Sequence, residues 1–269
     1  MKPTQVERAA TYALLILAAA FALYPLGLIV VTALQPDQIG ADGWFEIANF
    51  ANAWEIGRFG DYLSTSIIVS LAVVVLSATL ASLAGYAFGT MRFRGSTALF
   101  YLLLLGLMVP SEAIVVPLYY DLRAIGLTDT YLSLILPQVA QSLAFGTFWM
   151  RAYFRSSSRE VIDAARIDGA GHLRILWSIL LPMGRPALIT MVVLVFMWTW
   201  NEFLLPLVMI TDEDLRTAPL GLAFFQGQYT AGTSLLAAGA LLVALPVVVV
   251  YLIAQRHFIR GMLEGAVKG

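Results

Sequence analysis

The stretch that decides the fold is SSSREVIDAARIDGAGHLRILWSILLP, residues 156–182. It is rich in charged side chains and holds two glycines, whereas the whole chain of 269 residues is 60% hydrophobic and only 12% charged. A soluble domain carries about 25% charged residues. Most of this chain is therefore expected to face lipid rather than water, and residues 156–182 are expected to be a polar exception.

Composition excludes several classes of function. The formal net charge is −1, which argues against binding to nucleic acid. The chain has no cysteine, so neither a disulfide framework nor a cysteine-ligated metal is expected. The two histidines, His172 and His257, are far apart, and no residues near them have metal-ligand spacing. We therefore expect this chain to bind no metal and no cofactor.

Six apolar segments are long enough to cross a bilayer, which takes about 20 residues of helix. Two of them contain a single acid, Glu112 or Glu202, and the others carry no charge. The predicted spans lie near residues 10–34, 63–89, 97–119, 131–150, 186–210 and 235–255. The chain is thus expected to be an all-α membrane protein with one transmembrane domain over residues 1–269. Residues 221–234, which mix Gly, Gln and Thr with apolar residues, are expected to form a loop.

Basic residues indicate which side each loop faces, because cytoplasmic loops carry an excess of Lys and Arg. With both termini inside, 13 of the 16 basic residues are cytoplasmic, and only Arg58, Arg123 and Arg216 lie outside. The cytoplasmic set is Lys2, Arg8, Arg92, Arg94, Arg151, Arg155, Arg159, Arg166, Arg174, Arg185, Arg256, Arg260 and Lys268. Both termini are therefore predicted to be cytoplasmic, and residues 156–185 are predicted to be the longest cytoplasmic loop.

This loop has the signals of two helices joined by a glycine turn. Ser157 and Glu160 have the spacing of a capping box, which predicts a helix start. Gly169 and Gly171 can take the left-handed backbone that ends a helix. A second helix is expected over residues 172–181, with an apolar stripe at helical spacing. The stripe consists of Leu173, Leu176, Trp177 and Leu180.

Two interpretations of this helix–turn–helix are open. Ala164 and Ala165 favour helix and present a thin face that another surface can approach, which predicts a docking element for a cytoplasmic partner. The alternative is a solvated loop with incidental helicity.

Small residues indicate close packing in the span near 63–89. Ala81, Gly85 and Gly89 lie on one helical face, and small residues let helix backbones approach closely in lipid. Packing within the chain is the favoured interpretation, and a specific dimer seam is the alternative.

The loop also resembles a known signature. Membrane subunits of binding-protein-dependent ABC importers carry Glu-Ala-Ala, three residues, Gly, nine residues, Ile, one residue and Leu-Pro. Here Asp163-Ala164-Ala165 is followed at the same spacings by Gly169, Ile179 and Leu181-Pro182. The departure is Asp163 in place of glutamate, which keeps the carboxylate and shortens its reach by one methylene.

Three further segments resemble the maltose-type carbohydrate branch of that family. They are VPLYYDLRAIGLTDTYLSLILP (116–137), WTWNEFLLPLVMI (198–210) and QRHFIRGMLEGAVKG (255–269). The resemblance extends over most of the chain from residue 62 onward, and it implies that the transported solute is a carbohydrate.

The resemblance implies a type I ABC importer permease fold of the smaller six-span kind, in the plasma membrane of a prokaryote. It implies as partners a second homologous permease subunit, an ABC ATPase dimer, an extracytoplasmic solute-binding protein and the lipid bilayer. ATP and Mg²⁺ would be used by the ATPase, because this chain lacks the Gly-x-x-x-x-Gly-Lys-[Ser/Thr] phosphate-binding loop. The loop would couple to the ATPase through Glu160, Asp163, Ala164, Ala165, Asp168, Gly169, Ala170 and Gly171.

Acids within the predicted spans are candidates for the transport path, because a carboxylate in an apolar segment usually faces a cavity or a partner. Glu112 follows Pro110 and Ser111, where the span is expected to break, and Glu202 follows Asn201. Asn201 and Glu202 are candidates for hydrogen bonds to sugar hydroxyls, and Trp198 or Trp200 is a candidate for stacking on a sugar ring. The alternative for all of these residues is packing between helices or against the second permease subunit.

Two functional alternatives are kept. In the first, the same machinery imports a polyol phosphate or an amino sugar. A self-contained secondary transporter is the alternative from another class, but no inverted repeat is visible in the sequence, and the loop signature has no purpose without an ATPase.

Overall fold

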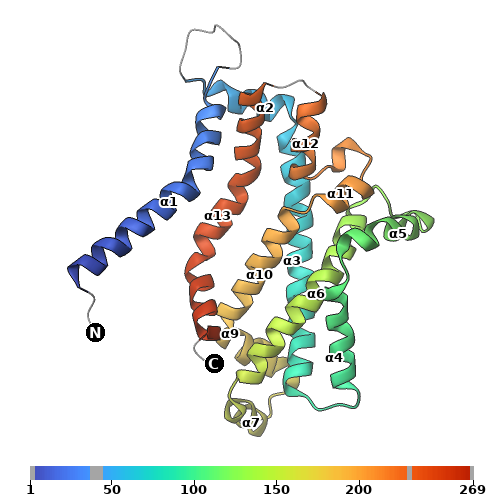
Figure 1. The fold of residues 1–269 in the computed structure, drawn as a ribbon. Helices are drawn as coiled ribbons and strands as arrows, with labels where there is room; N and C mark the ends of the chain where they lie inside the picture. Colours follow the sequence, from blue (N-terminus) through green and yellow to red (C-terminus); the bar gives the residue numbers. More distant parts are fainter. Residues whose placement is uncertain (1–3, 37–44, 229–231, 267–269) are drawn as a thin grey trace. The chain divides into compact units, whose positions relative to one another are not determined.

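The computed structural model describes residues 4–36, 45–228 and 232–266, and over these ranges it contains helices and turns but no strand (Figure 1). The chain packs as two compact units. One unit comprises residues 1–60 and 221–245, and the other comprises 61–220 and 246–269.

The first unit begins with helix α1 (Gln5–Ala33), which is closed at both ends by side chains. At its start Thr4 and Glu7 form a capping box, with the Thr4 amide donating to Glu7 Oε2 at 2.7 Å. At its end the Asn49 side-chain amide, from α2 (Ala48–Ile56), donates to the carbonyls of Ala33 and Gln35 at 2.9 and 2.8 Å. These bonds satisfy backbone groups that a helix end leaves without partners.

Phe59 organises the rest of this unit. Its ring packs edge-on against Phe225 of α12 (Ala218–Gln228), with centroids 5.6 Å apart. It also lies against Gly239 of α13 (Thr233–Ala266), where an added Cβ would come within 2.8 Å of the ring. The loop predicted over 221–234 is therefore wrong for its first half. Helix α12 forms there because Phe225 is buried and Pro219 stands in the first turn, where no amide donor is needed.

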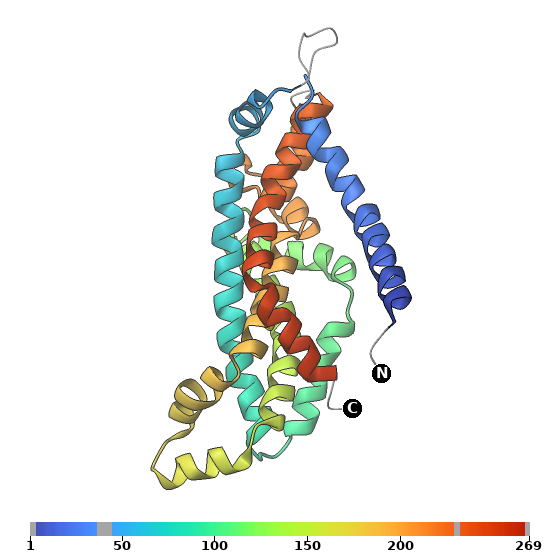
Figure 2. The same cartoon turned by 90° about the vertical axis from the view of Figure 1, so that its left-hand side faces the viewer.

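The second unit is built on a close seam between α3 (Phe59–Thr90) and α6 (Tyr131–Ser156), which lie side by side in Figures 1 and 2. A Cβ on Gly85 would lie 2.7 Å from Met150 Cβ and 2.9 Å from the Arg151 backbone nitrogen. A Cβ on Gly146 would lie 2.7 Å from Ala81 Cβ. The predicted small-residue face of α3 thus packs within the chain, as expected.

The segment predicted to span near 97–119 is broken. It forms α4 (Ser96–Leu105), a 3-10 turn η1 (Gly106–Met108) and α5 (Ser111–Ala124). Val109 is extended, with φ −83° and ψ 118°, because Pro110 disfavours the helical conformation in the residue before it. Helix α5 runs across the direction of α4 in both views (Figures 1 and 2).

The segment predicted to span near 186–210 is also broken. Helix α10 (Arg185–Trp200) ends at Trp200, and α11 (Leu204–Met209) follows after three non-helical residues. A short 3-10 turn, η3 (Glu213–Leu215), then leads to α12. The break falls where polar Asn201 and Glu202 interrupt the apolar run.

Three helices within the described ranges are long and apolar enough to cross a membrane. They are Gln5–Ala33, Phe59–Thr90 and the Thr233–Arg256 part of α13. A fourth crossing is possible as a pair, His172–Met183 with Arg185–Trp200, bent by 84°. The all-α multi-pass fold is confirmed, whereas the count of six spans remains a prediction. Helix α6 is 26 residues long, but polar side chains within it lower its mean hydropathy.

Candidate transport cavity and coupling loop

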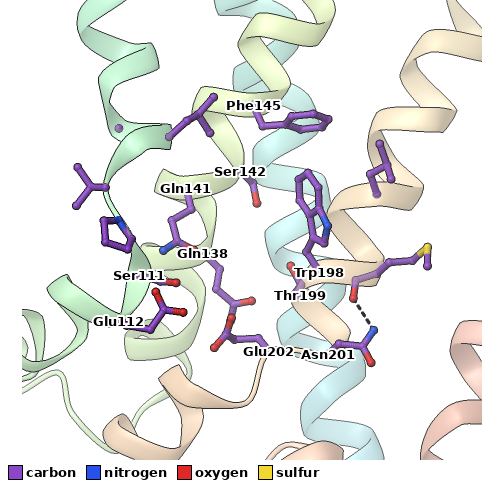
Figure 3. Close-up of a pocket in the computed structure, with 16 residues that line it drawn as sticks. Ser111, Glu112, Gln138, Gln141, Ser142, Phe145, Trp198, Thr199, Asn201 and Glu202 are labelled. Carbon is purple, nitrogen blue, oxygen red and sulfur yellow. Dashed lines mark hydrogen bonds between the residues drawn. The ribbon is translucent and has the colours of Figure 1, made fainter. Parts of the chain in front are cut away.

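A cavity of about 650 Å³ in the second unit brings all four predicted path residues together (Figure 3). These residues are Glu112, Trp198, Asn201 and Glu202. They come from α5, from α10 and from the break after it, so the two interrupted segments meet at one site. In lipid, non-helical backbone is tolerated where it lines a cavity, and both breaks satisfy that requirement here.

The helix breaks position the two carboxylates. Glu112 lies in the first turn of α5, where the positive end of the helix dipole favours an acid. Glu202 precedes α11, and its Oε1 accepts a hydrogen bond at 3.0 Å from the Leu205 amide, an otherwise unpaired donor of the first turn. Asn201 donates from Nδ2 to the Met197 carbonyl at 2.7 Å, which closes the end of α10. The side chains thus have structural as well as cavity-lining positions.

A polar stripe on α6 completes the opposite wall, and it was not predicted. Gln138, Gln141, Ser142 and Phe145 line the cavity at the spacing i, i+3, i+4, i+7 of one helical face. Gln138 Nε2 donates to the Leu134 carbonyl at 2.9 Å. The sequence contains a signal for this stripe, because glutamines are unusual in an apolar helix. The signal is weaker than that of a carboxylate, since a neutral amide is less conspicuous in an apolar segment.

Trp198 forms an aromatic wall. Its ring meets Phe145 edge-on, with centroids 4.7 Å apart, and Phe145 in turn lies 5.9 Å from Trp149. Trp198 is nevertheless 51% exposed, so part of the indole is available to a ligand. An aromatic face held in this way is suited to stack on an apolar face of a ring.

The charge of this cavity has one sign. Its lining includes the carboxylates of Glu112 and Glu202, together with hydroxyl and amide groups, and among the described residues it includes no Lys, Arg or His. Ionised carboxylates accept hydrogen bonds, and amides and hydroxyls both donate and accept. The arrangement can therefore bind a ligand with many hydroxyl groups, and it disfavours an anion.

A smaller cavity of about 170 Å³ adjoins this site and shares Ser111, Gln141 and Glu202 with it. Its other lining side chains are almost all apolar, and they come from α5, α6 and α11.

The loop predicted to be cytoplasmic contains a first helix, α7 (Arg159–Ile167), whose start differs from the prediction. Its N-cap is Ser158, and no side chain caps it. Ser157 instead ends α6, with its hydroxyl donating to the Tyr153 carbonyl at 3.1 Å. The capping box predicted from Ser157 and Glu160 is therefore wrong, because α6 continues to Ser156 and draws Ser157 into its own C-terminal turn.

The glycine turn after α7 is confirmed at Gly169, which has φ +78°. The Gly169 amide donates to the Arg166 carbonyl at 3.0 Å, and the Ala170 amide donates to the Ala165 carbonyl at 2.9 Å. This pair of bonds is a Schellman motif, which requires the left-handed backbone that glycine adopts most easily. Gly171 does not share this role, because its φ of −73° is open to any residue.

The second helix of the loop is longer and less regular than predicted. It comprises α8 (His172–Ile175), a π-helical turn η2 (Leu176–Leu180) and α9 (Leu181–Met183). A π-turn repeats at five residues rather than four, so Leu180 and Leu181 follow Ile175 and Leu176 at that interval, and all four are buried. The predicted stripe is therefore only half right, since Leu173 and Trp177 are 65% and 49% exposed.

The predicted coupling residues share one end of the second unit, at the foot of α6 (Figure 1). Most are exposed, whereas Ala170 is half-buried and Ala165 is only 7% exposed and packs with Ile162 against the chain's own core. The exposed members are Glu160, Asp163, Ala164, Asp168, Gly169 and Gly171. The thin alanine face therefore divides, with Ala165 turned inward and Ala164 available to a partner.

The part of the chain that the structure describes holds no candidate metal site. Among those residues, no group of three or more His, Asp or Glu side chains could hold an ion. The chain has no cysteine to contribute.

Comparison with known proteins gives one matching family. Residues 77–264 match the model of the binding-protein-dependent transport system inner membrane component. The chain is 31% identical over 274 residues to the maltodextrin transport system permease protein MdxG of Bacillus subtilis, covering 98% of this chain and 97% of that protein. It is 34% identical over 256 residues to the trehalose transport system permease protein SugB of Mycobacterium tuberculosis, covering 93% of each.

The fold also resembles a solved structure. A chain in the crystal structure of a bacterial ABC transporter involved in import of the acidic polysaccharide alginate superposes with a TM-score of 0.78. The superposition covers 96% of this chain and 99% of that one, at 22% sequence identity. The similarity at this identity concerns the fold.

Proposed function

The chain belongs to the family of binding-protein-dependent transport system inner membrane components, and from this premise we propose that it is the permease subunit of an ABC importer for a neutral carbohydrate. The solute would pass from an extracytoplasmic binding protein through the cavity of about 650 Å³. Family membership rules against the self-contained secondary transporter, because members of this family work with a binding protein.

The lining of this cavity is the observation that supports a carbohydrate as the solute. It combines a half-exposed indole, Trp198, with the carboxylates of Glu112 and Glu202 and the amides of Gln138 and Gln141. Such side chains stack on a sugar ring and bind its hydroxyls. The names of the maltodextrin and trehalose relatives support the same class.

Charge separates the alternative solutes. A polyol phosphate would meet two carboxylates and, among the described lining residues, no basic side chain, so it is disfavoured. An amino sugar would bring an ammonium group between Glu112 and Glu202, so it is the second candidate.

The remaining parts of the importer would be separate chains. We assign ATP and Mg²⁺ to an ABC ATPase dimer, because no phosphate-binding loop is present in this sequence. The ATPase would dock on α7 through Asp163 and Ala164 and the residues around Gly169, with both termini on that cytoplasmic side. A second permease subunit would complete the path.

Solute uptake tests the proposal. Proteoliposomes holding the assembled importer would be offered maltotriose, trehalose, glucosamine and glycerol 3-phosphate as radiolabelled solutes, with ATP on the side of the ATPase. Uptake of a neutral sugar is expected. Trp198→Ala should raise the half-saturating concentration of binding-protein-delivered sugar about three- to tenfold, and Trp198→Phe should raise it less, because an aromatic ring is retained. Uptake of glycerol 3-phosphate alone would overturn the proposal.

A further inference from the structure

A second cavity, of about 660 Å³, lies in the second unit where the ends of α3 and α6 meet α7 and α8. Its lining includes four arginines, one carboxylate and a histidine. They are Arg92, Arg155, Arg159, Arg166, Asp163 and His172. Its volume falls in the range of about 300–1,000 Å³ that is typical of ligand pockets.

Positive charge in this cavity is largely uncompensated. Asp163 pairs with Arg166 at 3.4 Å, and both side chains are exposed. Within the part of the chain that the structure describes, Arg92, Arg155 and Arg159 form no ion pair. Three guanidinium groups therefore share one cavity without a carboxylate each, which favours an anion among them.

A nearby arginine outside the cavity contrasts with these three. Arg151 lies one turn before Arg155 on α6 but does not line it. Its guanidinium carbon lies 3.8 Å from the centre of the Phe100 ring, and its Nε donates to the Phe88 carbonyl at 3.3 Å. Arg151 thus has intramolecular partners, whereas Arg92, Arg155 and Arg159 pair with no carboxylate among the described residues.

The start of α7 adds a second source of positive potential. No side chain caps its first turn, and the residues on either side of the N-cap, Ser157 and Arg159, both line the cavity. Uncapped amides at a helix start bind phosphate and other anions, helped by the helix dipole. The helix is nine residues long, so this dipole is developed.

The walls of the cavity are fixed by contacts within the chain. The Tyr86 hydroxyl lies 3.1 Å from His172 Nδ1, which joins α3 to the start of α8. The Tyr86 ring also packs edge-on against Phe154 of α6, with centroids 5.8 Å apart. Three elements that carry the lining are therefore held together by one tyrosine.

From these observations we propose that this cavity binds a phosphate group, carried either by an acidic lipid headgroup or by a free phosphate. Guanidinium groups pair with phosphate through two parallel hydrogen bonds. The cavity also lies at helix ends just beyond the segments predicted to span the membrane, and basic pockets at that depth on the cytoplasmic side bind lipid headgroups. The inference does not depend on which solute is transported.

Binding of two phosphate sources to the full chain in nanodiscs tests the proposal. In one arm, nanodiscs of phosphatidylcholine with one-fifth phosphatidylglycerol are analysed by native mass spectrometry for retained phosphatidylglycerol. In the other arm, nanodiscs of phosphatidylcholine alone are dialysed against radiolabelled inorganic phosphate. The double variant Arg92→Gln/Arg155→Gln should lower binding about tenfold or more in the arm that holds the true source.

A matched control variant distinguishes binding in the cavity from general electrostatic attraction to arginines on the surface. Arg94→Gln/Arg174→Gln removes two exposed arginines from the same predicted side of the membrane, neither of which lines the cavity, so it should retain binding. Arg92→Lys/Arg155→Lys keeps the charge and should retain part of it, and circular dichroism checks that all variants are folded. Loss confined to the lipid arm identifies a headgroup, and loss confined to the phosphate arm identifies a free phosphate. Equal losses in the two Gln variants, or no binding in either arm, would refute the site.

Discussion

Two cavities of the second unit have nearly the same volume, about 650 and about 660 Å³, but linings of opposite charge. Among the described lining residues, the first has two carboxylates and no basic group, and the second has four arginines and one carboxylate. The first is built where apolar segments break, and the second where helices end in a polar loop. Helix α6 contributes to both linings, so the local sequence rather than the framework sets the chemistry of each cavity.

Reversing the sign of the first cavity should have the largest effect. Glu202→Lys is expected to lower the initial rate of neutral sugar uptake about ten- to a hundredfold, because charge-assisted hydrogen bonds contribute about 1.5–3 kcal/mol. Glu202→Gln keeps an oxygen that can accept from the Leu205 amide, and it should cost much less. Normal uptake by the Lys variant in proteoliposomes would mean that this cavity is not the path.

Forcing apart the seam between α3 and α6 should have the second-largest effect. Gly85→Val places a side chain against Met150 and the Arg151 backbone, and overpacking of this kind costs about 1–3 kcal/mol. Gly27→Val in α1 is the matched control, since nothing lies within 4 Å of the added Cβ. Unfolding in denaturant, followed by tryptophan fluorescence, measures the difference. Equal free energies of unfolding for both variants would show that the seam is looser than described.

The loop that borders the second cavity should respond to backbone strain. Gly169→Ala is expected to destabilise the native conformation of this turn by about 1–2 kcal/mol, because the residue at this position has φ +78°. Asparagine tolerates this conformation, so Gly169→Asn should be milder. The measured quantity is solute transported per ATP hydrolysed by the reconstituted importer. The ratio of solute transported to ATP hydrolysed is expected to be highest for Gly, lower for Asn and lowest for Ala. Identical ratios for all three proteins would show that the turn conformation does not affect coupling.

The smallest effect is expected at the tyrosine that fixes the second cavity. Tyr86→Phe keeps the ring contact with Phe154 and removes the hydroxyl next to His172, at a cost of about 1 kcal/mol. Amide hydrogen exchange in α8 should then become about fivefold faster. Tyr120→Phe, at an exposed site on α5, is the control and should leave α8 unchanged. Unaltered amide exchange in both variants would show that the Tyr86 hydroxyl does not hold the start of α8 in place.

Uninterrupted apolar runs were the part of the fold that sequence predicted best. The spans near 10–34, 63–89 and 235–255 correspond to α1, α3 and α13, because length and hydropathy suffice to define such helices. The helix breaks were harder to predict from the sequence, since each depends on few residues. Pro110 gave a signal for the first, but Asn201 and Glu202 gave none that distinguishes a helix end from a polar residue within a helix.

The cavity residues were predicted in part, for a physical reason. Charge and aromatic character single out Glu112, Glu202 and Trp198 one at a time, and no chain-wide pattern shows that they converge. Gln138 and Gln141 were missed although their spacing was readable. In the loop, the π-turn shifted the buried face to a five-residue interval, which no four-residue pattern anticipates.

The helix breaks around the first cavity have a consequence for how solute preference can change. The breaks place residues 109–110 and 201–202 in the cavity lining, and substitution of a side chain leaves the backbone carbonyl groups of these residues unchanged. A side-chain scan will therefore undercount the determinants of selectivity. In evolutionary terms, relatives can exchange side chains at 138 and 141 to suit a different sugar while keeping the same main-chain frame, so new specificities can arise without remaking the fold.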